Sequence, residues 1–191
     1  GLCGVYNTSV IRELAEPMQS GTILEEEASE ATPFLTVIPV GKKGRDICHY
    51  RGYPIEKEFV GNFGKMDYDL ARGLGEYFVE EFTKGRADEV VLVYNRFVST
   101  LIQRVTVETL LPIKPLVSDG EPEEGVGFEP DFIYEPSPQA VLEKLIDRHL
   151  YTQMYRVILD ADASEHGARM TAMDNASNNA RDMIGSLTLL F

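Results

Sequence analysis

The cysteines and histidines are the residues of this sequence best suited to nucleophilic chemistry. Cys3 beside His49 or His166 would form a thiol–imidazole pair, in which the imidazole takes the thiol proton and leaves a reactive thiolate. Nothing in the spacing brings these residues together, and an unpaired cysteine usually acts as a small buried apolar residue. We therefore assign no nucleophile. Two cysteines are also too few for a disulfide scaffold, which favours a reducing compartment.

Two ionisable pairs on an expected helix could do metal or surface chemistry. Asp162 and His166 are spaced to share one helix face, as are Glu165 and Arg169. The first pair could begin a metal site, but no third ligand is apparent in the sequence. Pairs at this spacing more often contribute only weak surface electrostatics. We assign no metal ligand.

Glycines near basic residues raise the question of a phosphate site. The opening stretch GLCGVYN could form a turn before a helix, but it lacks the third glycine of a dinucleotide fingerprint. The stretch GKKGRD does not match the phosphate-binding loop GxxxxGK[ST]. The sequence therefore predicts no catalytic, metal or cofactor-binding residue and no cofactor.

The overall charge limits the classes of partner. Thirty-one acidic residues against 18 basic ones give a net charge of −13, which disfavours nucleic acid and direct docking on anionic lipid. No apolar run approaches the ~18 residues of a membrane span. Against this background the basic residues Lys42, Lys43 and Arg45, with Arg51, stand out. They form either a solvated loop or a surface for an acidic partner.

The first 135 residues alternate between helical and strand patterns. Residues 7–18 and 66–84 have the apolar spacing of helices, whereas 34–40, 87–98 and 100–113 are typical of strands. The runs at 34–40 and 90–95 lack polar alternation, which is expected of central strands covered on both faces. These residues predict an α/β domain over 1–135, with a mostly parallel sheet and flanking helices.

A long helix is expected over residues 136–191. Residues 114–131 form a loop rich in Pro, Gly and Glu, and a short strand is expected at 132–135. From residue 137 onward apolar residues recur at helical spacing, and no proline occurs after 138. About fifty helical residues would span ~75 Å, which is typical of a coiled coil or a shaft.

Small residues form a stripe along this helix. Ala168, Ala172, Ala176 and Ala180 recur every fourth residue and lie on one narrow face. Alanine favours the helix but buries little apolar area, so the stripe suits the close approach of a second helix. An exposed helix with incidental alanines remains the alternative.

Several stretches together resemble a known family. GLCGVYN, VIPVGKKGRD, VVLVYNRFVS, LLPI, FIYEPSPQAVLEKLI and ASEHGARMTAMDNASNNARDMI occur in the order of similar segments in the gamma subunit of rotary ATP synthases. The similarity covers essentially the whole chain. The stretch SEHGARMTAMDNAS is its most specific part. The chain resembles a central portion of such a subunit that lacks both ends.

The resemblance implies a mechanical function without catalytic residues. It implies a Rossmann-like domain joined to an antiparallel coiled-coil shaft, which couples ion flow through a membrane ring to ATP synthesis and hydrolysis on other subunits. Its implied partners are an epsilon-type subunit, the alpha/beta catalytic ring and the membrane rotor ring. The location implied is peripheral to an energy-transducing membrane, on the cytoplasmic or matrix side. We expect Lys42, Lys43, Arg45, Phe132 and Tyr134 to face partners.

Two other classes of function remain open on the residues alone. The first is a stand-alone nucleotide-binding α/β enzyme, which titration with ATP or ADP would reveal. The second is a coiled-coil scaffold unrelated to ATP synthases, which would not bind an epsilon-type subunit.

Overall fold

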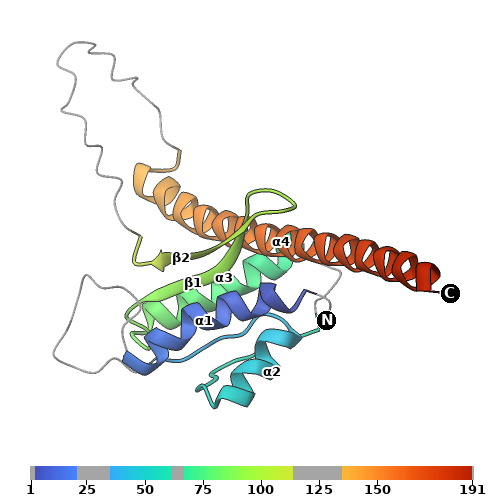
Figure 1. Ribbon diagram of the computed structural model, residues 1–191. Coiled ribbons are helices and arrows are strands. Elements are labelled where there is room, and N and C mark those ends of the chain that lie inside the picture. The colour runs from blue at the N-terminus through green and yellow to red at the C-terminus, as the bar shows by residue number, and fades with distance from the viewer. Residues whose placement is uncertain (1–2, 21–34, 62–66, 114–134, 191) are drawn as a thin grey trace, which may run out of the picture.

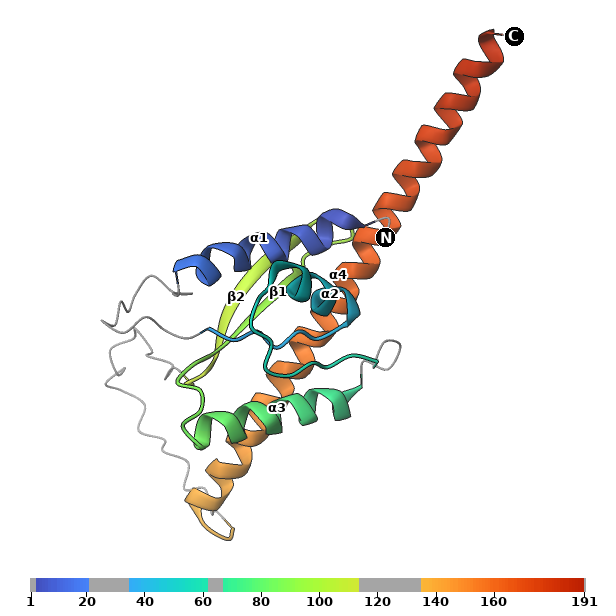
Figure 2. The same cartoon turned by 90° about the horizontal axis from the view of Figure 1, so that it is seen from below.

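The computed structural model describes residues 3–20, 35–61, 67–113 and 135–190. Along these ranges the order of elements is α1 (Gly4–Ser20), α2 (Lys42–Arg51), α3 (Tyr68–Thr83), β1 (Val90–Phe97), β2 (Gln103–Leu111) and α4 (Pro138–Leu190). The first half of α4 packs beside the other elements, and its second half projects away from them (Figure 1). The projection is clearest in the view from below (Figure 2).

The amphipathic helix expected at 66–84 is confirmed as α3. Asp67 caps its first turn, where the carboxylate Oδ1 accepts a hydrogen bond from the backbone N–H of Leu70 at 3.0 Å. The helix buries one face against α4 and the strands. The core cluster unites side chains of α3, both strands and α4: Leu70, Ala71, Leu74, Phe78, Val90, Leu110, Leu111, Leu150, Met154 and Ile158.

A glycine allows α3 and α4 to come close together. A Cβ atom on Gly75 would lie 2.5 Å from Cδ1 of Tyr151, closer than any real contact. Gly75 is buried, whereas Gly73 on the same helix has open space around it. The ring of Tyr151 therefore lies directly over the backbone of α3 at Gly75, and only glycine leaves room for it.

The strands at 87–98 and 100–113 are confirmed in type, but they pair antiparallel. β1 and β2 form a two-stranded hairpin with one irregularity between Val90 and Val91. A regular central strand over residues 34–40 is not found among the described residues 35–40. They make only two isolated parallel bridges, Val37 with Ile55 and Val40 with Phe59. Pro39 has no N–H to donate, which interrupts regular pairing here. The mostly parallel sheet is thus not seen in the described ranges.

The sequence around the basic cluster is helical, which corrects the expectation of a loop. Residues 42–51 form α2, between Gly41 and Gly52, both of which have positive φ angles of 109° and 70°. Glycine takes this backbone region without the steric cost that a side chain brings. The two glycines therefore define both ends of the helix, and one of its residues, Cys48, is buried.

The long helix is confirmed. α4 begins at Pro138, at the helix N-terminus where the missing N–H of proline costs nothing, and runs for 53 residues. Leu150, Met154, Val157 and Ile158 bury its inner face against the rest of the protein. No helix in the described ranges is long and apolar enough to cross a membrane.

Candidate functional site

Three polar side chains tie α1, β1 and α4 together at one point. Ser164 of α4 donates its hydroxyl hydrogen to the carbonyl oxygen of Asn95 on β1, at 2.9 Å. The Asn95 amide Nδ2 donates to the carbonyl oxygen of Tyr6 on α1, at 3.1 Å. The Tyr6 hydroxyl donates to the carbonyl oxygen of Ala161 on α4, at 2.8 Å. We call these four residues the junction triangle, because each of the three elements donates once and accepts once.

The junction triangle is buried at Ser164 and Asn95 and half-buried at Tyr6 and Ala161. The side chains of Ser164 and Asn95 lie in residues that are 0% and 2% exposed. Burial, and then the negative charge of Glu165, raise the pKa of Tyr6 to about 12, so its hydroxyl stays protonated as a donor at physiological pH. Unpaired polar groups in such surroundings would cost stability, whereas paired ones specify the geometry of the contact.

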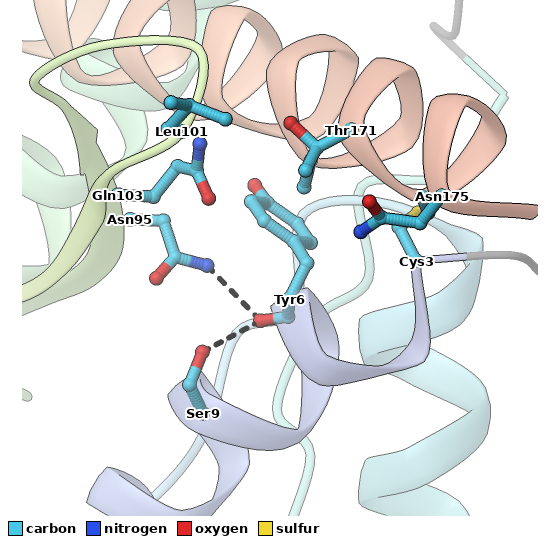
Figure 3. Close-up of a pocket in the computed structure, with 10 residues that line it drawn as sticks. Cys3, Tyr6, Ser9, Asn95, Leu101, Gln103, Thr171 and Asn175 are labelled. Atoms are coloured by element: carbon cyan, nitrogen blue, oxygen red, sulfur yellow. Dashed lines mark hydrogen bonds between the residues drawn. The ribbon is translucent and has the colours of Figure 1, made fainter. Parts of the chain in front are cut away.

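A cavity of about 320 Å³ lies beside the junction triangle. Its wall comes from the start of α1, the β1–β2 hairpin and α4, and includes Ala168 and Ala172 of the alanine stripe. The phenol of Tyr6 lies among Leu101, Gln103 and Thr171 (Figure 3). Among the described residues that line the cavity there is no histidine or carboxylate to act as a base toward Cys3.

A second polar contact joins α4 to the strands nearer the core. Nη2 of Arg156 lies 2.7 Å from each carboxylate oxygen of Glu108, and Nη1 of Arg156 donates to the Tyr94 hydroxyl at 3.1 Å. Partial burial alone would raise the pKa of Glu108. Hydrogen bonds from Arg156 and Tyr94 outweigh that effect and hold the pKa below its ordinary value.

The tip of the hairpin packs on α4 one turn beyond the junction triangle. Gly167 of α4 is buried, and a Cβ atom there would lie 3.3 Å from both Cα and the carbonyl oxygen of Thr100. One turn further on, the Thr171 hydroxyl donates to the same carbonyl oxygen at 3.1 Å. This contact is the last that α4 makes with the hairpin in the described hydrogen-bond network.

The alanine stripe is divided between two environments. Ala168 and Ala172 are half-buried at the cavity, whereas Ala176 and Ala180 are exposed. From residue 173 to 189 every residue of α4 is exposed, including the apolar Met183, Ile184, Leu187 and Leu189. Within the described ranges no element packs along this half of the helix (Figure 2).

Three of the five expected partner-facing residues lie on α2. Lys42 and Lys43 are exposed on the first turn of α2, which leaves them accessible. Arg45 follows on the same helix but bonds its neighbour Asp46 through Nε and Nη2. Phe132 and Tyr134 lie outside the described residues.

The thiol and metal hypotheses find no support in the described residues. Cys48 is buried, and burial raises the pKa of its thiol. His49 bonds the carboxylate of Glu58 at 2.7 Å. His166 lies 3.7 Å from Asp162, and no group of three ligand-type side chains gathers there or elsewhere in the described ranges.

Sequence comparison identifies the family. A family model described as ATP synthase matches residues 1–191, the whole chain. This chain belongs to the ATP synthase family. It is 40% identical over 189 residues to the ATP synthase gamma chain of Pelotomaculum thermopropionicum, and the match covers 99% of this chain and 61% of that one. The gamma chain of Chlorobaculum parvum is 38% identical, with 100% of this chain and 62% of the relative covered. The resemblance to gamma subunits is confirmed.

Chains of solved ATP synthase structures have a fold similar to that of this family member. The central stalk of the Tetrahymena thermophila mitochondrial ATP synthase has a TM-score of 0.65 at 23% identity, covering 93% of this chain and 71% of that one. The rotor of the Euglena gracilis mitochondrial ATP synthase has a TM-score of 0.62 at 20% identity, covering 97% and 66%. At these identities the likeness concerns the fold. This chain spans about three fifths of the length of the gamma chains it matches.

Sequence reasoning did not find the junction triangle. Its hydrogen bonds join residues separated by 69, 89 and 155 positions, and none of them belongs to a recognisable motif. Ser164 follows Ala161 and Ala163 in a stretch of small and polar residues, which is typical of the exposed face of a helix. One available signal was a polar residue, Asn95, at the end of the apolar run VVLVY.

Proposed function

We propose that this chain is part of the gamma subunit of a rotary ATP synthase. In this proposal it is a non-catalytic component of the central stalk, which couples ion flow through a membrane ring to ATP synthesis and hydrolysis on other subunits. The family match over the whole chain carries the proposal. Gamma chains at 40% and 38% identity support it.

The exposed half of α4 has the character that a rotating shaft needs. A shaft that turns inside a ring must be thin, stiff along its length and free of strong contacts at any one angle. On this half the alanine stripe continues through Ala176 and Ala180, and polar residues such as Asp174, Asn175 and Asn178 lie near them. Small side chains keep the helix narrow, and polar ones remain solvated during rotation.

We expect a second helix of the same subunit to pack on the exposed part of the alanine stripe. In this proposal Ala176 and Ala180 face an antiparallel helix, which completes a coiled-coil shaft and covers Met183, Ile184 and Leu187. Isolated helices are marginal in water, and tertiary contacts supply most of their stability. The strands described here then belong to a larger Rossmann-like sheet.

The globular part would bind the remaining rotor components. The partners in this proposal are an epsilon-type subunit and the membrane ring at the globular end, with the alpha/beta catalytic ring around the shaft. Lys42 and Lys43 are accessible and carry the charge needed for an acidic partner surface. The subunit would lie peripheral to the energy-transducing membrane, held there by the complex.

Reconstitution of coupling tests this function. The full-length subunit is combined with its own catalytic and epsilon-type subunits and added to membrane vesicles that carry the membrane ring. We expect ATP-driven ion pumping only when the subunit is present. Hydrolysis and pumping that need no such subunit would contradict the proposal. Tight binding of ATP or ADP to the isolated subunit in isothermal titration would instead favour a nucleotide-binding enzyme.

A further inference from the structure

We propose that Tyr6, Asn95 and Ser164 are positioning residues that fix the rotational setting of α4 on the globular part. Torque on the helix would pass into the globular part through the hydrogen bonds of the junction triangle. This inference rests on the proposed rotor function. It assigns a mechanical role to three side chains whose contacts lie far from one another in the sequence.

The junction triangle lies close to the start of the exposed part of α4. The exposed part of the helix begins at residue 173, and Ser164 lies about two and a half turns before it. Ser164 is also fully buried, and Gly167 is the last buried residue of α4 before the exposed part. The junction triangle is therefore among the first contacts with the globular part that carry torque applied to the exposed half of α4.

Near the junction triangle, side-chain packing alone resists rotation of α4 only weakly. Three of the residues that it places toward the cavity and the hairpin tip are small, Gly167, Ala168 and Ala172, and the two larger ones, Thr171 and Asn175, are polar. The cavity of about 320 Å³ leaves part of this face without neighbours. Large side chains that interdigitate would resist rotation of a helix, but small ones beside a cavity do not interlock in this way.

The hydrogen bonds supply the missing resistance. Ala161 and Ser164 are three residues apart, so their directions from the helix axis differ by about 60°. Ala161 is tied to α1 through Tyr6, and Ser164 is tied to β1 through Asn95. Rotation of α4 in either direction stretches or bends at least one tie, and hydrogen bonds weaken steeply when bent. The bond from Asn95 to Tyr6 fastens the two anchoring elements to each other.

The other contacts of α4 are less suited to this role. The core residues Leu150, Met154 and Ile158 pack through apolar surface, which is not directional. The pair of Arg156 with Glu108 is directional, but both side chains are 38% exposed, and solvent and salt weaken such pairs. Among these contacts the hydrogen bond from Ser164 to Asn95 alone is both directional and fully buried.

Torsional stiffness in the assembled motor tests the inference. The full-length subunit is placed in its complete ATP synthase, the catalytic ring is fixed to a surface, and a bead is attached through Asp88→Cys on the globular part. The motor is stalled with a non-hydrolysable ATP analogue, and the angular variance of the bead is measured. Thermal variance is inversely proportional to stiffness. We expect Ser164→Ala and Tyr6→Phe each to raise the variance on the order of twofold, because α4 loses one of the two hydrogen bonds that join it to the junction triangle.

Two control variants separate positioning from stability. Ile158→Val removes a buried methyl group from the core, which costs about as much stability as one lost hydrogen bond. Ser177→Ala removes a hydroxyl from the exposed half of α4. Neither should widen the distribution of bead angles. Equal variance in the junction variants and in Ile158→Val would overturn the inference while leaving the rotor function intact. A wild-type complex whose bead never rotates with ATP would overturn both.

Discussion

Arg156 of α4 holds Glu108 of β2 with one nitrogen, Nη2, placed 2.7 Å from both carboxylate oxygens. The same guanidinium donates from Nε to Gln153 and from Nη1 to Tyr94. One side chain thus donates to three residues on three elements: Gln153 of α4 itself, Tyr94 of β1 and Glu108 of β2. Only the fork of arginine presents donors in this arrangement.

We therefore expect Arg156→Lys to destabilise the protein although it keeps the charge. An ammonium group cannot reach the three acceptors together. Because both partners are partly exposed, the loss should be about 1 kcal/mol, or a fall of about 2–4 °C in Tm. Differential scanning calorimetry measures it. Arg181→Lys on the exposed half of α4 is the matched control and should leave Tm unchanged. Equal effects of both variants would show that the Arg156 contact adds nothing.

The same contact predicts a dependence of stability on pH. The folded state holds the pKa of Glu108 below its ordinary value, so this group binds its proton less readily when folded. Its stabilising contribution is complete above the ordinary glutamate pKa of about 4.3 and is lost as pH falls through the lowered value. We expect the stability difference between wild type and Glu108→Gln to shrink over that acid range in urea titrations. A difference that stays constant down to the lowest pH at which the protein folds would contradict this.

Gly75 and Gly73 make a matched pair on one helix. A methyl group at Gly75 would collide with Tyr151, whereas one at Gly73 meets open space. We expect Gly75→Ala to cost about 1–3 kcal/mol through overpacking. Gly73→Ala should instead stabilise by roughly 0.5–1 kcal/mol, because alanine has the higher helix propensity. Urea unfolding of the two variants tests the difference in sign.

Relief of the collision provides the control for Gly75. In the double variant Gly75→Ala/Tyr151→Ala the ring that meets the new methyl group is gone. The cost of Gly75→Ala should be much smaller in this background than in wild type, which a double-mutant cycle measures. The same cost in both backgrounds would mean that α3 and α4 do not approach each other at this point.

Overpacking of the exposed stripe tests the proposed second helix. In the full-length subunit, Ala176→Leu should force two closely packed helices apart and cost about 1–3 kcal/mol. Asn178 lies about 200° around the helix from Ala176, so Asn178→Leu should have little effect on stability. Thermal unfolding of both variants is compared with wild type. If Ala176→Leu proves as harmless as Asn178→Leu, Ala176 faces solvent and the stripe is incidental.

Local patterns were sufficient to predict most elements. The spacing of Leu70, Leu74 and Phe78 indicated α3, and the long apolar period from Leu142 indicated α4; both are present. α2 was missed because its residues are polar and include Gly44, which lowers helix propensity. Its boundaries depend instead on the positive φ angles of Gly41 and Gly52, which no periodicity reveals.

The contacts at the junction could not be predicted from the sequence. Ala168 and Ala172 were expected at a packing seam, and the structure places them at the wall of a cavity near the junction triangle. Whether another helix covers Ala176 and Ala180 stays a prediction. The partners of Ser164 and Tyr6 depend on how three elements meet, and such tertiary hydrogen bonds leave no local pattern in the chain.

Observation of rotation tests the central claim most directly. The full-length subunit, in a complex whose catalytic ring is fixed to a surface, carries a bead on the globular part at Asp88→Cys. We expect ATP to drive continuous rotation of the bead in one direction, and rotation to stop when ATP is withdrawn. A bead that stays still while the same complex hydrolyses ATP at its full rate would contradict the assignment of this chain to the rotor.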